Sequence, residues 1–189
     1  FNIPSKVTAI NDGTFYNCVG MTTVDIPDNI TLIGNNAFEN CSNLKGITIP
    51  GTVTSIGEYA FYRYESDQPL TIPEGVTTIG LGAFRRCTGL TSVAIPESVT
   101  TIGSDAFYGC TGLSYTLIIP ENVTTIGAHA FRGCTGLEEV ILPEDLTTVQ
   151  VYAFSGCTGL EKIWLDAAVT TIGTKAFENC GNLTIHGVE

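Results

Sequence analysis

Apolar and polar residues follow one another in the same order about every 23 residues along the whole chain, a spacing typical of repeat architectures. Each copy begins with an apolar residue, usually followed by proline, and continues through V-T-T-I-G and A-F to a cysteine and a leucine. Eight copies are present, and they begin at Ile3, Ile26, Ile49, Ile72, Ile95, Ile119, Leu142 and Leu165. The pattern therefore predicts a stack of eight equivalent units.

A short strand is predicted where one unit ends and the next begins. Over 90–96, the sequence L-x-x-V-x-I-P has the apolar spacing of a strand that points Leu90, Val93 and Ile95 inward. Pro96 ends the strand because proline has no backbone N–H to donate to a sheet. Stacked units place these strands side by side, so we expect a parallel sheet along one face.

The remainder of each unit is predicted to return along other faces. Residues 99–103 form a second extended piece, and Gly103 suits a turn with positive φ. Residues 105–110 are predicted to form a short helical turn that leads back to the next strand. One unit cannot bury its apolar side chains alone, so neighbouring units must cover them.

Two columns of identical residues are expected to fill the interior. One phenylalanine per unit forms a predicted aromatic spine, consisting of Phe15, Phe38, Phe61, Phe84, Phe107, Phe131, Phe154 and Phe177. One cysteine per unit, with a single exception, forms the second column, consisting of Cys18, Cys41, Cys87, Cys110, Cys134, Cys157 and Cys180. One Cys per unit lacks the close pairs of a zinc site, so we predict buried, reduced thiols, with pairing under oxidation left open.

Composition predicts a single domain over residues 1–189 and excludes several classes of partner. The chain is 43% apolar and 14% charged, with no linker or charge block that would divide it. Its net charge of −11, with only 8 Lys and Arg, disfavours nucleic acid and anionic membrane surfaces. No apolar run reaches the roughly 18 residues of a membrane helix, so no membrane insertion is expected in this segment.

The units resemble the BspA-like class of leucine-rich repeats, whose pattern I-P-x-x-V-T-x-I-G-x-x-A-F-x-x-C-x-x-L-x-x-V is met along the whole chain. The resemblance implies a right-handed leucine-rich-repeat solenoid with a parallel sheet on one face and short helical turns on another. It also implies a bacterial cell-surface or secreted protein that adheres to a protein or glycan, such as host matrix or another cell. The family offers no catalytic residues and no cofactor, and we expect the chain to be a fragment of a longer protein.

Two units depart from the pattern. The third has Tyr64 in the cysteine column, Asp67 in place of a leucine and Pro69 at a strand position, which predicts a local bulge. The fifth carries one extra residue near 115–117, which predicts a β-bulge.

Other chemistries are disfavoured. His129 has no evident nucleophile beside it, and a triad with Ser104 and Asp105 needs a geometry that the stack does not obviously supply, so no enzyme is expected. An ice-binding face needs two outward threonines per strand, whereas the threonines here are adjacent and point to opposite sides. The row of one glutamate per unit, which calcium could bridge, is expected to be a solvated turn row; it consists of Glu74, Glu97, Glu121 and Glu144.

The candidate binding surface is the outward column between Val and Ile of each predicted strand. This column changes from polar to apolar along the chain and ends in Ile118, Ile141 and the single tryptophan, Trp164. An exposed apolar patch with a polar rim is typical of an interaction site. The predicted partner-binding residues are Tyr115, Ile118, Ile141, Trp164, Glu139 and Lys162. The alternatives are a spacer that displays another domain, and packing of the same patch against a terminal segment outside this sequence or against another copy of the chain.

Overall fold

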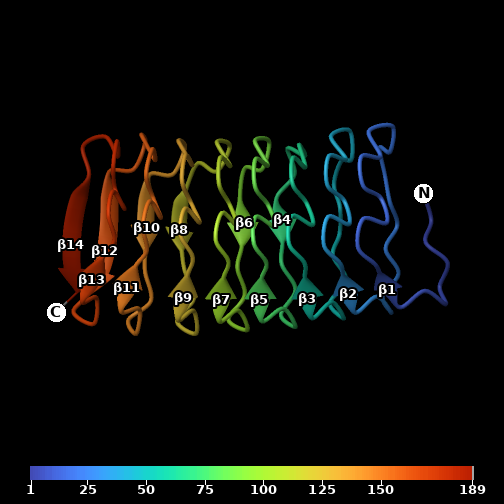
Figure 1. Cartoon of the computed structure of the whole chain (residues 1–189), viewed down its shortest axis with the longest axis horizontal. Coiled ribbons are helices and arrows are strands. Elements are labelled where there is room, and N and C mark those ends of the chain that lie inside the picture. The colour runs from blue at the N-terminus through green and yellow to red at the C-terminus, as the bar shows by residue number, and fades with distance from the viewer. Residues whose placement is uncertain (189) are drawn as a thin grey trace.

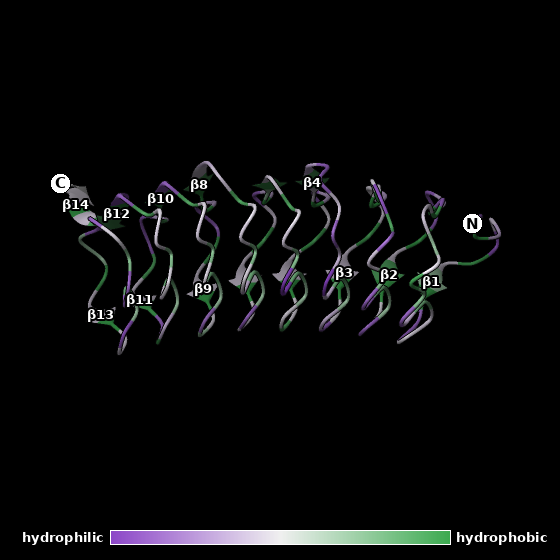
Figure 2. Cartoon of the chain, turned by 90° about the horizontal axis from the view of Figure 1, so that it is seen from above, coloured by the Kyte–Doolittle hydropathy of each residue, from purple (hydrophilic) through white to green (hydrophobic). Residues whose placement is uncertain are grey.

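The chain forms a rod of stacked coils with one terminus at each end (Figure 1). The computed structural model describes residues 1–188. Each coil contributes short strands to parallel sheets, and the two main sheets lie on different faces of the rod (Figure 2). The predicted stack of about 23-residue units with parallel strands is confirmed.

The longer sheet is built from the second extended piece of each unit. Six strands pair in parallel in the order β1-β2-β3-β5-β7-β9, and β11 and β13 form a separate pair. In most of these strands the first residue faces solvent and the second, usually isoleucine, is buried. The strands are β1 (Ala9–Ile10), β2 (Leu32–Ile33), β3 (Ser55–Ile56), β5 (Thr78–Ile79), β7 (Thr101–Ile102), β9 (Thr125–Ile126), β11 (Thr148–Val149) and β13 (Thr171–Ile172).

The sheet predicted from the L-x-x-V-x-I-P strands is present from β4 onward, in two parts. Four strands pair in the order β14-β12-β10-β8, and β4 pairs with β6. Nearer the N-terminus only the bridge between Asn2 and Asp25 marks this face. The strands are β4 (Leu70–Thr71), β6 (Val93–Ala94), β8 (Thr116–Ile118), β10 (Glu139–Ile141), β12 (Lys162–Asp166) and β14 (Thr184–Val188).

Tyrosine hydroxyls occupy two of the places where this sheet is interrupted, before β4 and between β6 and β8. The backbone N–H of Ile47 donates to Tyr64 Oη at 2.8 Å, and the Tyr64 ring is buried in the cysteine column. Tyr115 Oη accepts from Val93 N–H at 3.0 Å and donates to Val93 O at 2.9 Å. Each hydroxyl therefore satisfies backbone groups at which a neighbouring strand would otherwise pair.

The β-bulge predicted within 115–117 is wrong. Strand β8 pairs with β10 without interruption from Thr116 to Ile118, and the extra residue lies in a bend at Tyr115, before the strand. In the third unit the buried polar residue is Ser66, whose Oγ accepts backbone N–H groups, whereas Asp67 is exposed.

The predicted short helical turns are also wrong, because no helix occurs in residues 1–188. The backbone has positive φ at Asp105 and again at Gly109, so no helical run can form between them. Successive amides alternate: Phe107 N–H donates to Ala130 O of the next coil at 2.8 Å, whereas Tyr108 N–H donates to Asp105 O at 3.0 Å. An α-helix instead directs every N–H to the carbonyl four residues earlier. We call the surface formed by these turns (12–17, 35–40, 58–63, 81–86, 104–109, 128–133, 151–156 and 174–179) the turn face.

The aromatic spine and the cysteine column fill the interior as predicted. Neighbouring phenylalanine rings stack with centroids 5.2–5.9 Å apart from Phe15 to Phe177. All seven cysteines are free, and burial raises the pKa of the Cys41 thiol to about 11 and that of Cys157 to about 12. Six thiols donate to a phenylalanine carbonyl of the preceding unit, as Cys110 Sγ does to Phe84 O at 3.0 Å. Cys18 and Cys180 at the ends are only half-buried, so inaccessibility holds for the five interior thiols.

Close contact between coils, and not positive φ, is the reason for the glycine at Gly103. Its φ is ordinary, but a Cβ there would lie 2.8 Å from the backbone carbon of Gly80. Gly127 repeats the arrangement one coil later. Gln150 takes the same position in the next coil, and there the longer sheet ends: β11 pairs with β13 but not with β9.

No helix that could cross a membrane is present in the part of the chain that the structure describes.

Gly103→Ala is expected to destabilise the fold by about 1–3 kcal/mol, because the added methyl group overlaps backbone atoms that cannot move independently. Gly51→Ala is the control, because nothing lies within 4 Å of a Cβ at that turn. Urea unfolding followed by circular dichroism measures both free energies of unfolding. Equal stability of the two variants would contradict the packing argument.

Candidate functional site

The predicted surface residues lie on the sheet formed by β8, β10, β12 and β14. Parallel register aligns Ile118 with Ile141, Ile141 with Trp164, and Trp164 with His186. The structure thus brings the three apolar residues of the predicted column into one row and adds His186, which was not among the predicted residues. We call these four residues the sheet row. A second row on the same face consists of Thr116, Glu139, Lys162 and Thr184.

Exposure is uneven along the sheet row. Ile118 is 62% exposed, whereas Ile141 and Trp164 are half-buried. The indole of Trp164 stacks on the imidazole of His186 with centroids 4.6 Å apart and an interplanar angle of 25°. Trp164 was predicted to be solvent-accessible, and the structure leaves it accessible only in part. The signal that could have identified His186 is its position in the same column, one unit after Trp164.

Glu139 holds the tryptophan from the neighbouring row. Trp164 Nε1 donates to Glu139 Oε1 at 2.7 Å, and Thr116 Oγ1 donates to Glu139 Oε2 at 3.1 Å. These hydrogen bonds stabilise the charged carboxylate and lower the pKa of Glu139, to which the exposed Lys162 adds a smaller electrostatic effect. The indole is therefore fixed on one side by a hydrogen bond and on the other by a stacked ring.

Tyr115 contributes to the structure rather than presenting a free hydroxyl. Its Oη is bonded to both backbone groups of Val93, and burial raises the pKa of this phenol. Together with Ile118 it lines a shallow hollow of about 280 Å³ between the two parts of the sheet. Tyr115 therefore borders the sheet row without belonging to it.

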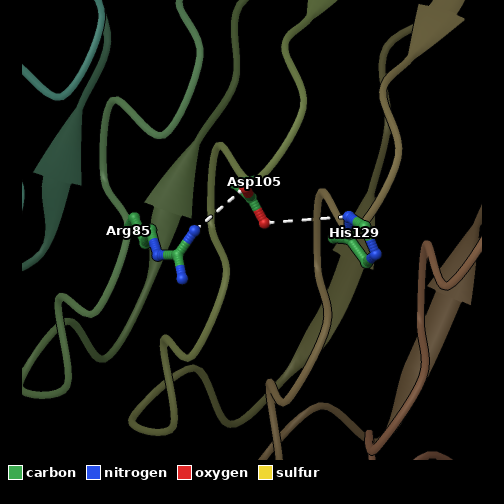
Figure 3. A network of polar contacts seen from close by, with 3 residues as sticks. All are labelled: Arg85, Asp105 and His129. Carbon is green, nitrogen blue, oxygen red and sulfur yellow. Dashed lines mark hydrogen bonds and ion pairs between the residues drawn. The ribbon is translucent and has the colours of Figure 1, made fainter.

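His129 lies on the turn face, in the polar network drawn in Figure 3. Its Nδ1 is 3.9 Å from Asp105 Oδ1, and the other oxygen of Asp105 accepts from Arg85 at 2.9 Å. The imidazole also stacks on Tyr152 with centroids 5.2 Å apart. Within residues 1–188, no serine, threonine or cysteine donates a hydrogen bond to His129, so the structure shows no activated nucleophile there.

The glutamate row does not converge on a common point. Glu121 Oε2 accepts the backbone N–H of Glu144 at 2.9 Å, so it caps the corresponding turn of the next coil. Among the described residues, no three acidic, histidine or cysteine side chains lie together as a metal site would require.

The sequence pattern of the family described as "BspA type Leucine rich repeat region" matches in six copies, over residues 1–114 and 114–186. A comparison with curated proteins gives no match.

Solved structures of bacterial repeat proteins share the fold. A leucine-rich cell surface protein of Faecalibacterium prausnitzii is 31% identical with a TM-score of 0.74, over 100% of this chain and 60% of that one. A leucine-rich repeat protein of Bacteroides ovatus is 29% identical with a TM-score of 0.57, over 97% and 64%. One from T. pallidum is 25% identical with a TM-score of 0.65, over 97% and 77%. The chain thus spans less than two thirds of the length of the first two.

Acid is expected to shift the fluorescence of Trp164 before the protein unfolds. The pKa of Glu139 is lowered on folding, so its contribution to stability is present above the usual glutamate pKa of about 4.3 and is lost as pH falls through the lower folded value. Protonation then weakens the hydrogen bond to the indole, and the emission of Trp164 changes. Glu139→Gln should abolish this transition and Glu138→Gln should retain it, with circular dichroism reporting unfolding separately. A transition that persists in Glu139→Gln would contradict this assignment.

Proposed function

This chain belongs to the BspA-type leucine-rich repeat family, and on that premise we propose that it is a non-enzymatic binding module of a cell-surface or secreted protein. It engages a protein partner through the sheet row and the polar row beside it. Family membership and the similarity to a bacterial cell surface protein support the surface location.

The observation that carries the proposal is the row of large apolar and aromatic side chains on adjacent strands. Ile118 is among the most exposed large apolar residues of the chain, and Trp164 is the side chain most typical of an interface hot spot. The polar row of Thr116, Glu139, Lys162 and Thr184 lies alongside, as the rim of an interface does.

Preorganisation also favours binding. Trp164 is held by Glu139 and His186 on paired strands, so little rotamer freedom remains for a partner to remove. The sheet row has one residue on each of four adjacent strands, so a partner that lies across the strands contacts all four side chains.

A spacer that only displays another domain is the competing function. A rod is a suitable shape for a spacer. A spacer role, however, gives no reason for an exposed Ile118 beside a tryptophan that is held in place by its neighbours. Self-association through the sheet row is a second competitor, because the same apolar surface could bind a copy of itself.

Trp164→Ala is expected to weaken partner binding by about 1–3 kcal/mol, as truncation of an interface anchor commonly does, with little change in the fold. The measurement is surface plasmon resonance of the immobilised chain against a panel of purified extracellular matrix proteins. Ile172→Ala is the matched control, because Ile172 is 50% exposed but lies on β13, outside the sheet row.

Three results would overturn the proposal. Equal binding by Trp164→Ala and the unaltered chain would place the site elsewhere. Absence of binding to every protein in the panel, and to a bacterial or host cell surface, would favour the spacer. A dimer in sedimentation equilibrium that Ile118→Ala dissociates would assign the row to self-association.

A further inference from the structure

Two arginines on the turn face occupy a backbone position that disfavours them. The last residue of each six-residue turn has positive φ, and Arg63 and Arg86 adopt it with φ of 59° each. The six other units have asparagine or glycine there, the residues that tolerate this conformation best. These are Asn17, Asn40, Gly109, Gly133, Gly156 and Asn179. The conformation by itself gives no reason for arginine in two successive units.

Charge makes the arginine pair less favourable still. Equivalent residues of adjacent coils lie about 4.8 Å apart at the backbone, and like charges placed side by side repel. Neither arginine has a carboxylate within ion-pair distance in residues 1–188, whereas Arg85 pairs with Asp105 and Lys175 with Glu178. In a chain of net charge −11, two exposed arginines without an ion pair thus lie side by side, an arrangement that favours an anion beside them.

The surface around the pair is hollowed and polar. A hollow of about 420 Å³ is lined by both arginines and by Asn17, Val19, Asn40, Ser42, Glu65 and Thr88. A second hollow of about 420 Å³ lies beside it, lined by Asn36, Glu39, Tyr59, Tyr62, Arg85 and Arg86. Arg86 therefore borders both hollows.

We propose that these two hollows form a binding site for an acidic polysaccharide, with Arg63 and Arg86 holding a carboxylate or sulfate group of the sugar. A guanidinium presents a planar fork of donors that matches either anion. The amides of Asn17 and Asn40 and the hydroxyls of Ser42 and Thr88 would bind the sugar hydroxyls. This site is separate from the sheet row and does not depend on its function.

The lining favours a sugar over an acidic peptide. Peptide anchors need apolar pockets, and Val19 is the one aliphatic side chain that lines the first hollow. The second hollow instead offers the rings of Tyr59 and Tyr62, whose centroids are 6.1 Å apart and edge-to-face. Aromatic rings of this kind pack against the C–H faces of a sugar, and neighbouring carboxylates such as Glu39 accept from its hydroxyls.

Two further arginines lie on the turn face, each packed against a tyrosine ring of a neighbouring coil, and Arg85 is also paired with Asp105. The guanidinium of Arg85 lies 4.4 Å from the ring centroid of Tyr108, and that of Arg132 lies 4.9 Å from that of Tyr152. All four arginines of the chain are thus on the turn face. An extended anionic chain that binds Arg63 and Arg86 in adjacent coils would reach Arg132 two coils further along.

The test uses calorimetric titration with four probes: an oligogalacturonate, a chondroitin sulfate oligosaccharide, a neutral galactan oligosaccharide and polyglutamate of matched charge. We expect binding of one or both acidic sugars that weakens with salt, and no binding of the neutral sugar. Arg63→Asn and Arg86→Asn should each weaken it about tenfold or more, as loss of a charged hydrogen bond does. Because asparagine already occupies this position in other units, both variants should fold at least as stably as the unaltered chain.

Lys6→Asn is the matched control, because it removes one exposed charge outside the turn face. It should bind like the unaltered chain, and so should Trp164→Ala. The proposal is overturned if Lys6→Asn weakens binding as much as Arg63→Asn, since diffuse charge would then suffice. Polyglutamate that binds as tightly as the sugars and depends on Arg86 would assign the site to an acidic peptide. Absence of binding to both acidic sugars would also reject it.

Discussion

Backbone hydrogen bonds between successive coils are the interaction on which the rest of this structure depends. Along each turn, alternate amides donate to the next coil and to their own, so that Phe107 N–H reaches Ala130 O and Cys110 N–H returns to Phe107 O. This alternation requires positive φ at two points of every turn and keeps the coils in register. The stacked phenylalanine rings and the thiols bonded to phenylalanine carbonyls follow from that register. A coil without neighbours would leave about half of these amides unpaired, and each would be costly to bury.

The places where the stack is irregular follow from the same constraint. At Gln150 a side chain replaces the glycine that permits close approach, and the longer sheet ends there. At Tyr64 and Tyr115 the neighbouring strand does not pair, and a phenol hydroxyl bonds to the free backbone groups instead. The two tyrosine units thus replace lost strand pairing by hydroxyl hydrogen bonds, whereas at Gln150 the strand pairing is lost. Because β6 and β8 do not pair, β8 is the first strand of a separate four-stranded sheet. The sheet row lies on this uninterrupted sheet.

The two proposed sites use the rod differently. On the sheet face, β structure directs every second residue outward, so a column of apolar residues becomes a continuous surface for a protein. On the turn face, the same positive-φ position of two adjacent coils holds the exposed Arg63 and Arg86, so two charged groups lie at the spacing of the stack. The solved repeat proteins of Faecalibacterium prausnitzii and T. pallidum share the scaffold, which by itself does not fix what the outward residues bind.

The sequence by itself determined the unit length, the number of units, the buried phenylalanine and cysteine columns, and the family. These are consequences of period and of apolar spacing, which are local in the chain. It also placed Ile118, Ile141 and Trp164 in one column, because alternation along a strand fixes which residues point outward. Only the tertiary structure decided that the turns are not helical, that Gly103 serves close packing, and that Tyr115 bonds to Val93. Each of these depends on atoms of a neighbouring coil about 23 residues away. The sequence of one unit does not show which group of the next coil pairs with a given amide or hydroxyl. The contacts of Trp164 with Glu139 and His186 belong to the same class, because the register between strands creates them.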